Sequence, residues 1–418
     1  MNVDFLRHSR AVVRAALERV SPINCVDNLS FLCQCLGSAR ELERLQLPCT
    51  ALAAAIATLQ RTMGVDFFAD VWPKVERWLL DDTHSTTLPL LCQETTSSVR
   101  LSESHIRFLL AHAFLGNLNT AEGNFGVLSF VGLFTRPDHP ESVERIVCQL
   151  CYFALADDCD DNAFVTFERH VQRKDVDDWL LSTAPLNRDL VTIHRDLMEA
   201  PMGDARRPCF VDFANRDLMI HRLIPSATQE EILFSCVPSC LVGLLFCERM
   251  TDNEVITIKN VRRYCDYTGY LSTFRFAGPH ANRAATFDIV ALDACTFAHW
   301  SEEAIVRDLN KAHNAWRHFS AVSTGAWGCG AFGGDWFAKI VQQLCAASLT
   351  NCHLFLSSRD GTRAQDAEEM FAAADAAKLT VGAAVRILLA YKGAYQVERV
   401  DFKRWFIAEC NRSIENHN

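Results

Sequence analysis

The chain has 418 residues and a formal net charge of −10 at pH 7. Hydrophobic residues make up 49% and charged residues 22%, which excludes general disorder and predicts a large apolar core. The negative charge argues against broad non-specific DNA binding, because such binding needs basic surface to displace counterions from phosphates. We therefore expect a folded protein with room for two or three domains.

No segment is typical of a membrane anchor or a secretory signal. The most apolar uncharged run, 232–247, contains a proline and is short for a membrane span, and the N-terminus lacks an uninterrupted apolar core. Most of the cysteines lie beside apolar residues. Cys148 and Cys151 fall in an amphipathic helical pattern without a second close pair of metal ligands. We expect an intracellular protein, in the nucleus or cytoplasm, with reduced thiols and no metal or cofactor.

Residues 1–162 are expected to form a mainly helical region, because apolar residues recur there at intervals of three and four. Prolines and glycines interrupt the pattern. One helix is expected to begin after Ser102 as its N-cap and to stop at Gly116.

From residue 163 onward, short β-branched or aromatic runs alternate with helical stretches. This alternation is typical of a mixed or parallel sheet that helices cover on both faces. The expected fold class is α/β, with a helical region at 1–162 followed by a three-layer α/β domain and C-terminal helices at 163–418. The expected strands are AFVTFERHV, CFVDFA, EVITIKNV, TFDIVALDA and CHLFLSS.

Four glycines lie within seven residues in the run GCGAFGGD at 328–335, directly before a helical pattern. Glycines permit positive φ and close backbone approach, and the N–H groups at a helix start attract anions. The run has neither the sequence of a Walker A loop nor that of a dinucleotide-binding fingerprint. Taken alone, it is either a phosphate-binding loop or a tight structural turn.

Three other runs carry polar residues that suit a ligand site. QEE at 229–231 opens a helix, where one glutamate can face a pocket and donate a proton, or both can form an ordinary acidic helix start. DYTGY at 266–270 places two tyrosines around a glycine, where the rings can meet a base or sugar or simply pack. VDFANR at 211–216 lies at a strand end, where α/β sheets bind ligands, although polar strand ends are also common.

In the order VDFANR, QEEILF, DYTGY and WGCGAFGGD, these runs closely resemble the catalytic domain of poly(ADP-ribose) glycohydrolases. The resemblance extends to LSESHIRFLLAHAFLG, FVTFERHV and KLTVGAAVRILLAY. It implies a macrodomain-like α/β/α sandwich joined to an N-terminal helical domain. It also implies hydrolysis of the ribose–ribose O-glycosidic bonds of poly(ADP-ribose), with release of ADP-ribose.

The resemblance implies catalytic or substrate-binding roles for several residues of these runs. Glu231 is the implied catalytic acid, which protonates the departing ribose hydroxyl and then activates water, and Glu230 orients the neighbouring ribose. The N–H groups of the glycine-rich loop take the diphosphate. The expected partner is poly(ADP-ribose) or ADP-ribose, without a membrane or sequence-specific nucleic acid. The implied substrate-binding residues are Asp212, Asn215, Gln229, Tyr270, Gly330, Ala331, Phe332, Gly333 and Gly334.

One segment departs from the family's pattern. The family carries a triple-glycine signature between VDFANR and QEE, whereas residues 217–228 of this chain contain no glycine. Met219, Ile220 and His221 place Cβ atoms where the family has none, and β-branched Ile resists positive φ. We expect three side chains on the wall that faces the ribose, and an activity that is reduced or lost.

Two alternatives therefore stay open from the sequence. The first is a poly(ADP-ribose) glycohydrolase, active or weakened. The second is an inactive relative that binds ADP-ribose or serves as a structural or interaction protein. The family's acidic residue on the adenine side has no clear counterpart in VTIHRDLMEA at 191–200.

Overall fold

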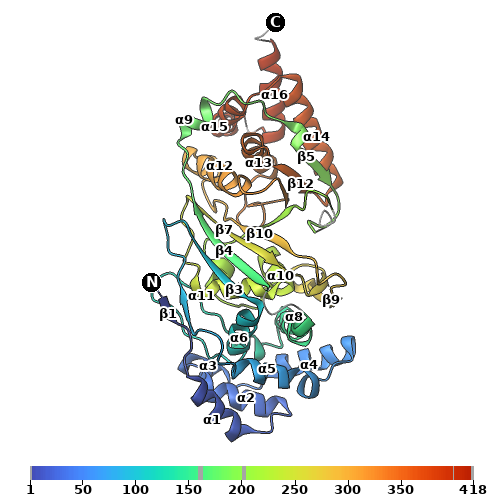
Figure 1. Ribbon diagram of the computed structural model, residues 1–418. Coiled ribbons are helices and arrows are strands. Elements are labelled where there is room, and N and C mark those ends of the chain that lie inside the picture. The colour runs from blue at the N-terminus through green and yellow to red at the C-terminus, as the bar shows by residue number, and fades with distance from the viewer. Residues whose placement is uncertain (1, 159–162, 200–203, 399, 416–418) are drawn as a thin grey trace.

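The computed structural model describes the whole chain except residues 1, 159–162, 200–203, 399 and 416–418. The molecule is elongated, with the N-terminal helices at one end, a sheet in the middle and the C-terminal helices at the other end (Figure 1). The boundary expected after residue 162 falls next to a segment that lies outside the described residues.

The N-terminal region is helical, as the spacing of its apolar residues predicts. Ser102 caps the expected helix by accepting a hydrogen bond from the backbone N–H of His105 at 3.1 Å. Gly116 follows the end of that helix with a φ of +73°. The helices are α1 (Arg10–Val20), α2 (Val26–Leu36), α3 (Ala39–Arg44), α4 (Thr50–Met63), α5 (Trp72–Leu79), α6 (Glu103–Phe114), α7 (Val131–Phe134) and α8 (Pro140–Leu155).

A mixed sheet of eight strands forms the middle of the molecule. Its spatial order is β3 (Ser97–Ser102), β4 (Phe164–Val171), β7 (Glu254–Val261), β10 (Phe287–Ala291), β6 (Cys209–Asp212), β11 (Ala321–Thr324), β12 (His353–Ser357) and β5 (Val191–His194). Pairing is antiparallel from β3 to β10 and parallel from β10 to β5. The expected strands are all present, and β3 adds an edge strand from the region expected to be helical.

Helices cover both faces of the sheet, in agreement with the expected three layers. In β6, Phe210 packs into the core shared with the helical region, whereas Val211 packs into the core on the opposite face. A strand buried on both faces is apolar at successive positions, which explains the run CFV. The remaining helices are α9 (Val176–Leu180), α10 (Gln229–Cys236), α11 (Gly243–Phe246), α12 (Glu302–Trp316), α13 (Trp336–Thr350), α14 (Gly361–Ala376), α15 (Val381–Glu398) and α16 (Phe402–Glu415).

Short elements complete the chain. Two-stranded sheets pair β1 (Asn2–Asp4) with β2 (Thr87–Pro89) and β8 (Cys265–Thr268) with β9 (Arg275–Pro279). A π-helical turn, Phe67–Val71, precedes α5. The 3₁₀ turns are Ala156–Asp158, Arg188–Leu190, Leu218–His221, Pro238–Val242 and Leu271–Thr273.

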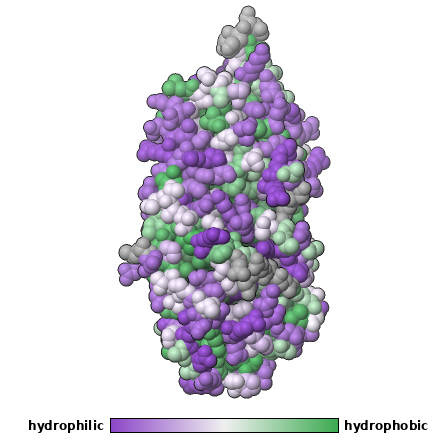
Figure 2. All heavy atoms as spheres, viewed as in Figure 1, coloured by the Kyte–Doolittle hydropathy of each residue, from purple (hydrophilic) through white to green (hydrophobic). Residues whose placement is uncertain are grey.

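The described residues include no single helix that is long and apolar enough to cross a membrane. One pair of helices, Gln229–Cys236 with Pro238–Phe246, passes that test by length and composition, but the chain bends by 110° between its two halves. Most of its residues are buried inside the molecule. On the face shown in Figure 2, hydrophilic residues predominate and apolar residues form scattered groups. Cys148 and Cys151 are fully buried in α8 as free thiols, as the amphipathic pattern predicts.

The helical region touches the α/β domain closely at Gly126. Its N–H donates a hydrogen bond to the carbonyl of Leu244 at 2.9 Å, and the N–H of Val127 donates to the carbonyl of His221 at 2.8 Å. A Cβ on Gly126 would lie 2.9 Å from the Leu244 oxygen and 3.1 Å from the Cα of His221. Because both neighbours are backbone atoms, only glycine fits here without a shift of the chain.

Gly126→Ala should therefore lower the free energy of unfolding by about 1–3 kcal/mol, the usual loss when extra atoms enter a packed site. Urea denaturation measures this loss. Gly132→Ala is the matched control, because a Cβ at Gly132 meets only the guanidinium of Arg44, which can swing away. Within α7 that control should be neutral or slightly stabilising. Equal losses in the two variants would contradict the close backbone approach at Gly126.

Candidate active site

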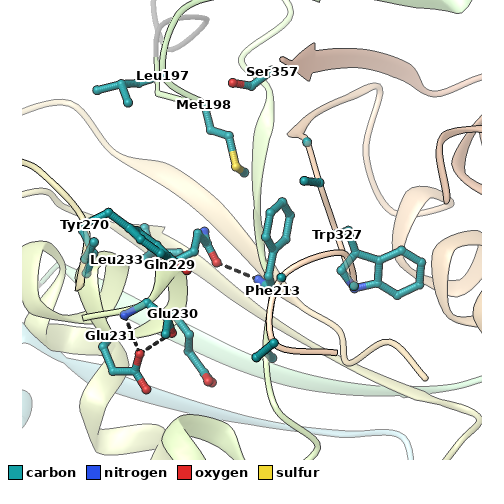
Figure 3. A pocket seen from close by; sticks show the side chains of 18 of the residues that line it. Leu197, Met198, Phe213, Gln229, Glu230, Glu231, Leu233, Tyr270, Trp327 and Ser357 are labelled. Atoms are coloured by element: carbon teal, nitrogen blue, oxygen red, sulfur yellow. Dashed lines mark hydrogen bonds between the residues drawn. The ribbon is translucent and has the colours of Figure 1, made fainter. Parts of the chain in front are cut away.

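A cleft of about 670 Å³ opens where the ends of β6, β11 and β12 meet the N-terminus of α10 (Figure 3). These three strands are parallel neighbours, so their carboxyl ends lie at one edge of the sheet. This is the edge at which α/β sheets bind ligands. The lining residues come from five stretches of the chain, within 197–199, 210–233, 267–270, 325–336 and 357–363.

Both glutamates of the QEE run line the cleft, and each is only 4% exposed. One oxygen of Glu231, Oε2, accepts hydrogen bonds from the backbone N–H of Thr228 at 2.9 Å and from the Thr228 hydroxyl. Glu231 thus closes a capping box at the start of α10. Its other oxygen, Oε1, makes no hydrogen bond to any described residue. Glu231 therefore has a fixed side chain and one oxygen that can serve a ligand.

Glu230 fixes the backbone of the segment that precedes α10. Its Oε1 accepts a hydrogen bond from the N–H of Met219 at 2.7 Å, and its Oε2 accepts one from the N–H of Asn215 at 3.3 Å. Hydrogen bonds from N–H groups to a carboxylate are among the stronger ones in proteins. Both oxygens are therefore engaged by this chain, which makes Glu230 a positioning residue for the loop.

Asp212 lies behind the two glutamates and does not line the cleft. It is fully buried, and neither of its oxygens has a hydrogen-bond partner among the described residues. Burial raises the pKa of Asp212 well above its usual 3.8, and the charge of Glu231 raises it further. Burial also raises the pKa of Glu230, and the charges of Asp212 and Glu231 add to that rise. Asp212 and Glu230 therefore hold their protons to a higher pH than isolated carboxyls do, because neighbouring buried carboxyls resist joint ionisation.

Arg145 of α8 brings a buried positive charge from the helical region to this cluster. The residue is 3% exposed, and its guanidinium donates hydrogen bonds to the carbonyl of Ile224 at 2.6 Å and to the hydroxyl of Ser235 at 3.2 Å. Burial lowers the pKa of Arg145, and the charge of Glu231 is the largest influence in the opposite direction. The helical region therefore contributes to the electrostatics of the cleft.

Three consecutive residues of the glycine-free segment adopt the backbone conformation that glycine favours. Met219, Ile220 and His221 have φ values of +53°, +48° and +58°. Such a conformation costs a residue other than glycine roughly 1–2 kcal/mol. The surrounding hydrogen bonds therefore hold a strained segment in place.

The three side chains of this segment point in different directions. Ile220 lines the cleft, Met219 is fully buried in the core, and the ring of His221 lies 3.6 Å from the carboxylate of Asp217. The expectation of three side chains on the ribose wall is therefore wrong for Met219 and His221. The physical reason is that each step of a left-handed turn rotates the direction of Cβ.

The glycine-rich loop is folded on itself by its own backbone. The N–H of Gly333 donates to the carbonyl of Gly330 at 3.0 Å, and the N–H of Gly334 donates to that of Gly328 at 2.9 Å. A Cβ on Gly334 would lie 2.8 Å from the same Gly328 oxygen. Within the described part of the chain, the N–H groups of residues 330–332 have no acceptor, and all three residues line the cleft. These three donors form a cradle for an anion.

Gln229 and Tyr270 frame the cleft from the α10 side. The side chain of Gln229 joins α10 to β6, because it accepts from the N–H of Phe213 at 2.8 Å and donates to the carbonyl of Val211 at 3.1 Å. Tyr270 is 48% exposed. Burial raises the pKa of Tyr270, and the charge of Glu231 adds to the effect. Its ring is thus available at the mouth of the cleft.

The structure brings most of the predicted site residues together. Those that line the cleft are Asn215, Gln229, Glu230, Glu231, Tyr270, Gly330, Ala331 and Phe332. Asp212, Gly333 and Gly334 do not line it; Asp212 lies behind the glutamates, and the two glycines close the loop.

Several cleft residues were missed from the sequence. Glu199 lies in VTIHRDLMEA, where no acidic residue was assigned; it lines the cleft and accepts a hydrogen bond from the hydroxyl of Tyr267 at 2.9 Å. Trp327 comes just before the glycine-rich loop, and Arg359 and Arg363 follow β12. Applying the strand-end rule to CHLFLSS would have pointed to both arginines.

Comparison with known proteins finds one family over most of the chain. Residues 59–169 match the family model described as "Poly (ADP-ribose) glycohydrolase (PARG), helical domain", and residues 176–366 match the one described as "Poly (ADP-ribose) glycohydrolase (PARG), Macro domain fold". Together the matches cover more than two thirds of the 418 residues. They confirm the expected macrodomain fold with an N-terminal helical domain.

Two relatives from Arabidopsis thaliana are similar over most of their length. The chain is 28% identical to poly(ADP-ribose) glycohydrolase 1 over 426 residues, which covers 79% of this chain and 77% of that protein. It is 26% identical to probable poly(ADP-ribose) glycohydrolase 2 over 436 residues, which covers 83% and 81%. A solved structure of a poly(ADP-ribose) glycohydrolase from Deinococcus radiodurans in complex with ADP-ribose matches 42% of this chain and 80% of that chain. Its identity is 14% and its TM-score 0.31, which is too low to support an argument.

The buried acidic cluster predicts how stability depends on pH. Because the folded chain keeps a proton on Asp212 above 3.8, where the unfolded chain releases it, the free energy of unfolding should fall as pH rises from about 4 toward neutral. Asp212→Asn should make this decline shallower by up to about 1.4 kcal/mol per pH unit. Urea denaturation across this pH range measures both slopes.

The matched control is Asp177→Asn, which makes the same substitution at an exposed position of α9. Its decline with pH should follow that of the wild type. Parallel curves for wild type and Asp212→Asn would show that Asp212 ionises normally in the folded chain.

Proposed function

The chain belongs to the poly(ADP-ribose) glycohydrolase family, and we propose that it hydrolyses ribose–ribose O-glycosidic bonds of poly(ADP-ribose) to release ADP-ribose. The position of Glu231 carries this proposal. Its carboxyl lines the cleft with one oxygen that makes no hydrogen bond to the described residues, and the same cleft holds three N–H groups of the glycine-rich loop that have no acceptor among them. A proton donor and an anion cradle are the two elements that this reaction needs.

Glu231 is the proposed acid, because the other two carboxyls of the cluster are less suited to reach a ligand. Asp212 does not line the cleft, and both oxygens of Glu230 already accept backbone hydrogen bonds. In this proposal, protonated Glu231 passes its proton to the departing ribose oxygen as the C–O bond breaks. The negative charge left on the cluster stabilises the positive charge that develops on the ribose ring.

Water completes the reaction at the same carboxylate. Glu231, now ionised, accepts a proton from a water molecule whose oxygen bonds to the anomeric carbon, and the glutamate returns to its protonated state. One glutamate thus serves as acid and then as base, which differs from the usual glycosidase arrangement of two carboxyls with separate roles.

The remaining residues hold the ligand in this proposal. The N–H groups of residues 330–332 bind the diphosphate, and the ring of Phe332 packs on the ribose. His299 supports this arrangement, because its ring Nε2 lies 2.7 Å from the carbonyl oxygen of Phe332 and fixes that peptide. Asn215 and Gln229 frame the ribose end, and Tyr270 closes the mouth of the cleft.

We further propose that Ile220 weakens this activity. It is the one residue of the three glycine replacements whose side chain lines the cleft. A reacting ribose must lie about 3–3.5 Å from its catalytic group, and a displacement of about 1 Å can reduce the rate 10²-fold. The second candidate function is binding of ADP-ribose without cleavage of the polymer. It would apply if the side chain of Ile220 excluded the scissile ribose completely.

Glu231→Gln should reduce turnover of poly(ADP-ribose) by about 10²–10⁴-fold while ADP-ribose still binds, because the amide keeps the shape but cannot donate the proton. Release of ADP-ribose measures turnover, and calorimetry measures binding. Glu303→Gln is the matched control, since it makes the same substitution in the exposed first turn of α12. Turnover by Glu231→Gln equal to that of the control would eliminate Glu231 as the acid.

Ile220→Gly should raise turnover, by up to about 10²-fold, because it removes the side chain that displaces the ribose. His221→Gly is the matched control: it relieves a similar backbone strain, but its side chain lies outside the cleft, so turnover should stay at the wild-type level. The idea fails if Ile220→Gly and wild type release ADP-ribose at the same rate. Met219→Gly is unsuitable for this test, since it deletes a fully buried side chain.

A further inference from the structure

The order of strands in the sheet sets the order of functional groups along the cleft. β6 leads to Asn215 and the segment before α10, β11 leads to the glycine-rich loop, and β12 leads to Arg359 and Arg363. The three strands are direct neighbours, each about 4.8 Å from the next. In Figure 3, Glu231 lies at one end of the cleft and Ser357, the last residue of β12, lies at the other.

The two ends of the cleft differ in charge. Glu230 and Glu231 line one end, and the buried carboxyl of Asp212 lies behind them. Arg359 and Arg363 line the β12 end, and they are the only cationic side chains among the described residues that line the cleft. In a chain with a net charge of −10, this pair is a local exception that suits an anionic ligand.

Arg359 is an exposed side chain on a fixed backbone. The hydroxyl of Ser357 donates to the carbonyl of Asp196 at 2.7 Å, and the N–H of Ser358 donates to the carbonyl of His194 at 2.8 Å, so the loop is anchored to the chain at the end of β5. Among the described residues, Arg359 makes no hydrogen bond or ion pair. Its charge is therefore open to a ligand.

Arg363 lies in the first turn of α14 and is also only loosely paired. Its side chain is 54% exposed, and its Nε lies 3.8 Å from an oxygen of Asp360. Burial raises the pKa of Asp335, the N-cap of α13, and the charge of Arg363 is among the influences that lower it. Arg363 thus lies on the side of α14 that faces the glycine-rich loop.

We propose that Arg359 and Arg363 bind the phosphate groups of a second ADP-ribose unit, joined to the adenosine ribose of the unit held at Glu231 and the glycine-rich loop, at the end away from the bond that Glu231 breaks. This inference rests on the proposed function. The N–H groups of residues 330–332 already serve the diphosphate of the first unit, and the arginines lie one strand farther along the cleft, at its exposed rim. Guanidinium groups bind phosphate in bidentate fashion, and a second unit supplies phosphate beyond the diphosphate held at the loop.

The pair therefore gives the cleft a preference for polymer over free ADP-ribose. The test measures the dissociation constants of ADP-ribose and of a purified poly(ADP-ribose) oligomer, in a Glu231→Gln background that prevents cleavage. In the double variant Arg359→Gln/Arg363→Gln, affinity for the oligomer should fall about tenfold or more, because two charge-assisted contacts are lost. The affinity for ADP-ribose should stay within about twofold of the parent value. The affinity for the oligomer should also depend less steeply on salt concentration.

The matched control is Arg61→Gln, which makes the same change of charge on the exposed surface of α4, in the N-terminal helical region and away from β12 (Figure 1). It should leave both affinities unchanged. Unchanged oligomer affinity in the double variant would overturn the inference, and an equal loss for both ligands would also overturn it, by assigning the arginines to the diphosphate of the first unit. If ADP-ribose fails to bind even the parent protein, the proposed function itself fails, and the inference fails with it.

Discussion

The hydrogen bonds from Met219 and Asn215 to the buried carboxylate of Glu230 are the interaction on which the cleft depends. They join the end of β6, the glycine-free segment and the first turn of α10 at one point. Without these acceptors, the buried N–H group of Met219 would lose its partner, at about 1–3 kcal/mol, and the partly buried N–H group of Asn215 would lose its partner as well. The same bonds offset the strain of three consecutive left-handed residues, which a segment free to relax would not retain.

The helical region completes this arrangement from the other side. Val127 donates to the carbonyl of His221, and Arg145 donates to the carbonyl of Ile224, so the C-terminal end of the strained segment and the residues after it are tied to the N-terminal region. Arg145 also places its buried charge beside the acidic cluster. The catalytic end of the cleft is therefore assembled where the two regions meet, and neither region contains all of its parts.

Elements that follow from a residue pattern along the chain could be predicted from the sequence. Strands and side-chain positions that depend on tertiary contacts could not. The apolar run EVITIKNV coincides with β7, because a strand buried in a sheet is apolar at successive positions. The glutamate pair and the glycine-rich loop were found because their residue types suit their chemistry. The edge strand β3, however, has no apolar run, and it forms because β4 offers a partner for its backbone. Glu199 was missed because it follows its strand by several residues and reaches the cleft through a loop.

The glycine-free segment 217–228 separates two properties that glycine normally supplies together. The first is a backbone that turns with positive φ, and Met219, Ile220 and His221 retain it. The second is the absence of side-chain volume, which matters only where a Cβ points at the ligand. The side chain of Met219 is buried in the core, and that of His221 lies beside Asp217. Only the side chain of Ile220 therefore takes up space in the cleft. The glycine-free segment thus brings a single side chain, that of Ile220, into the cleft on a backbone path that glycine would also favour.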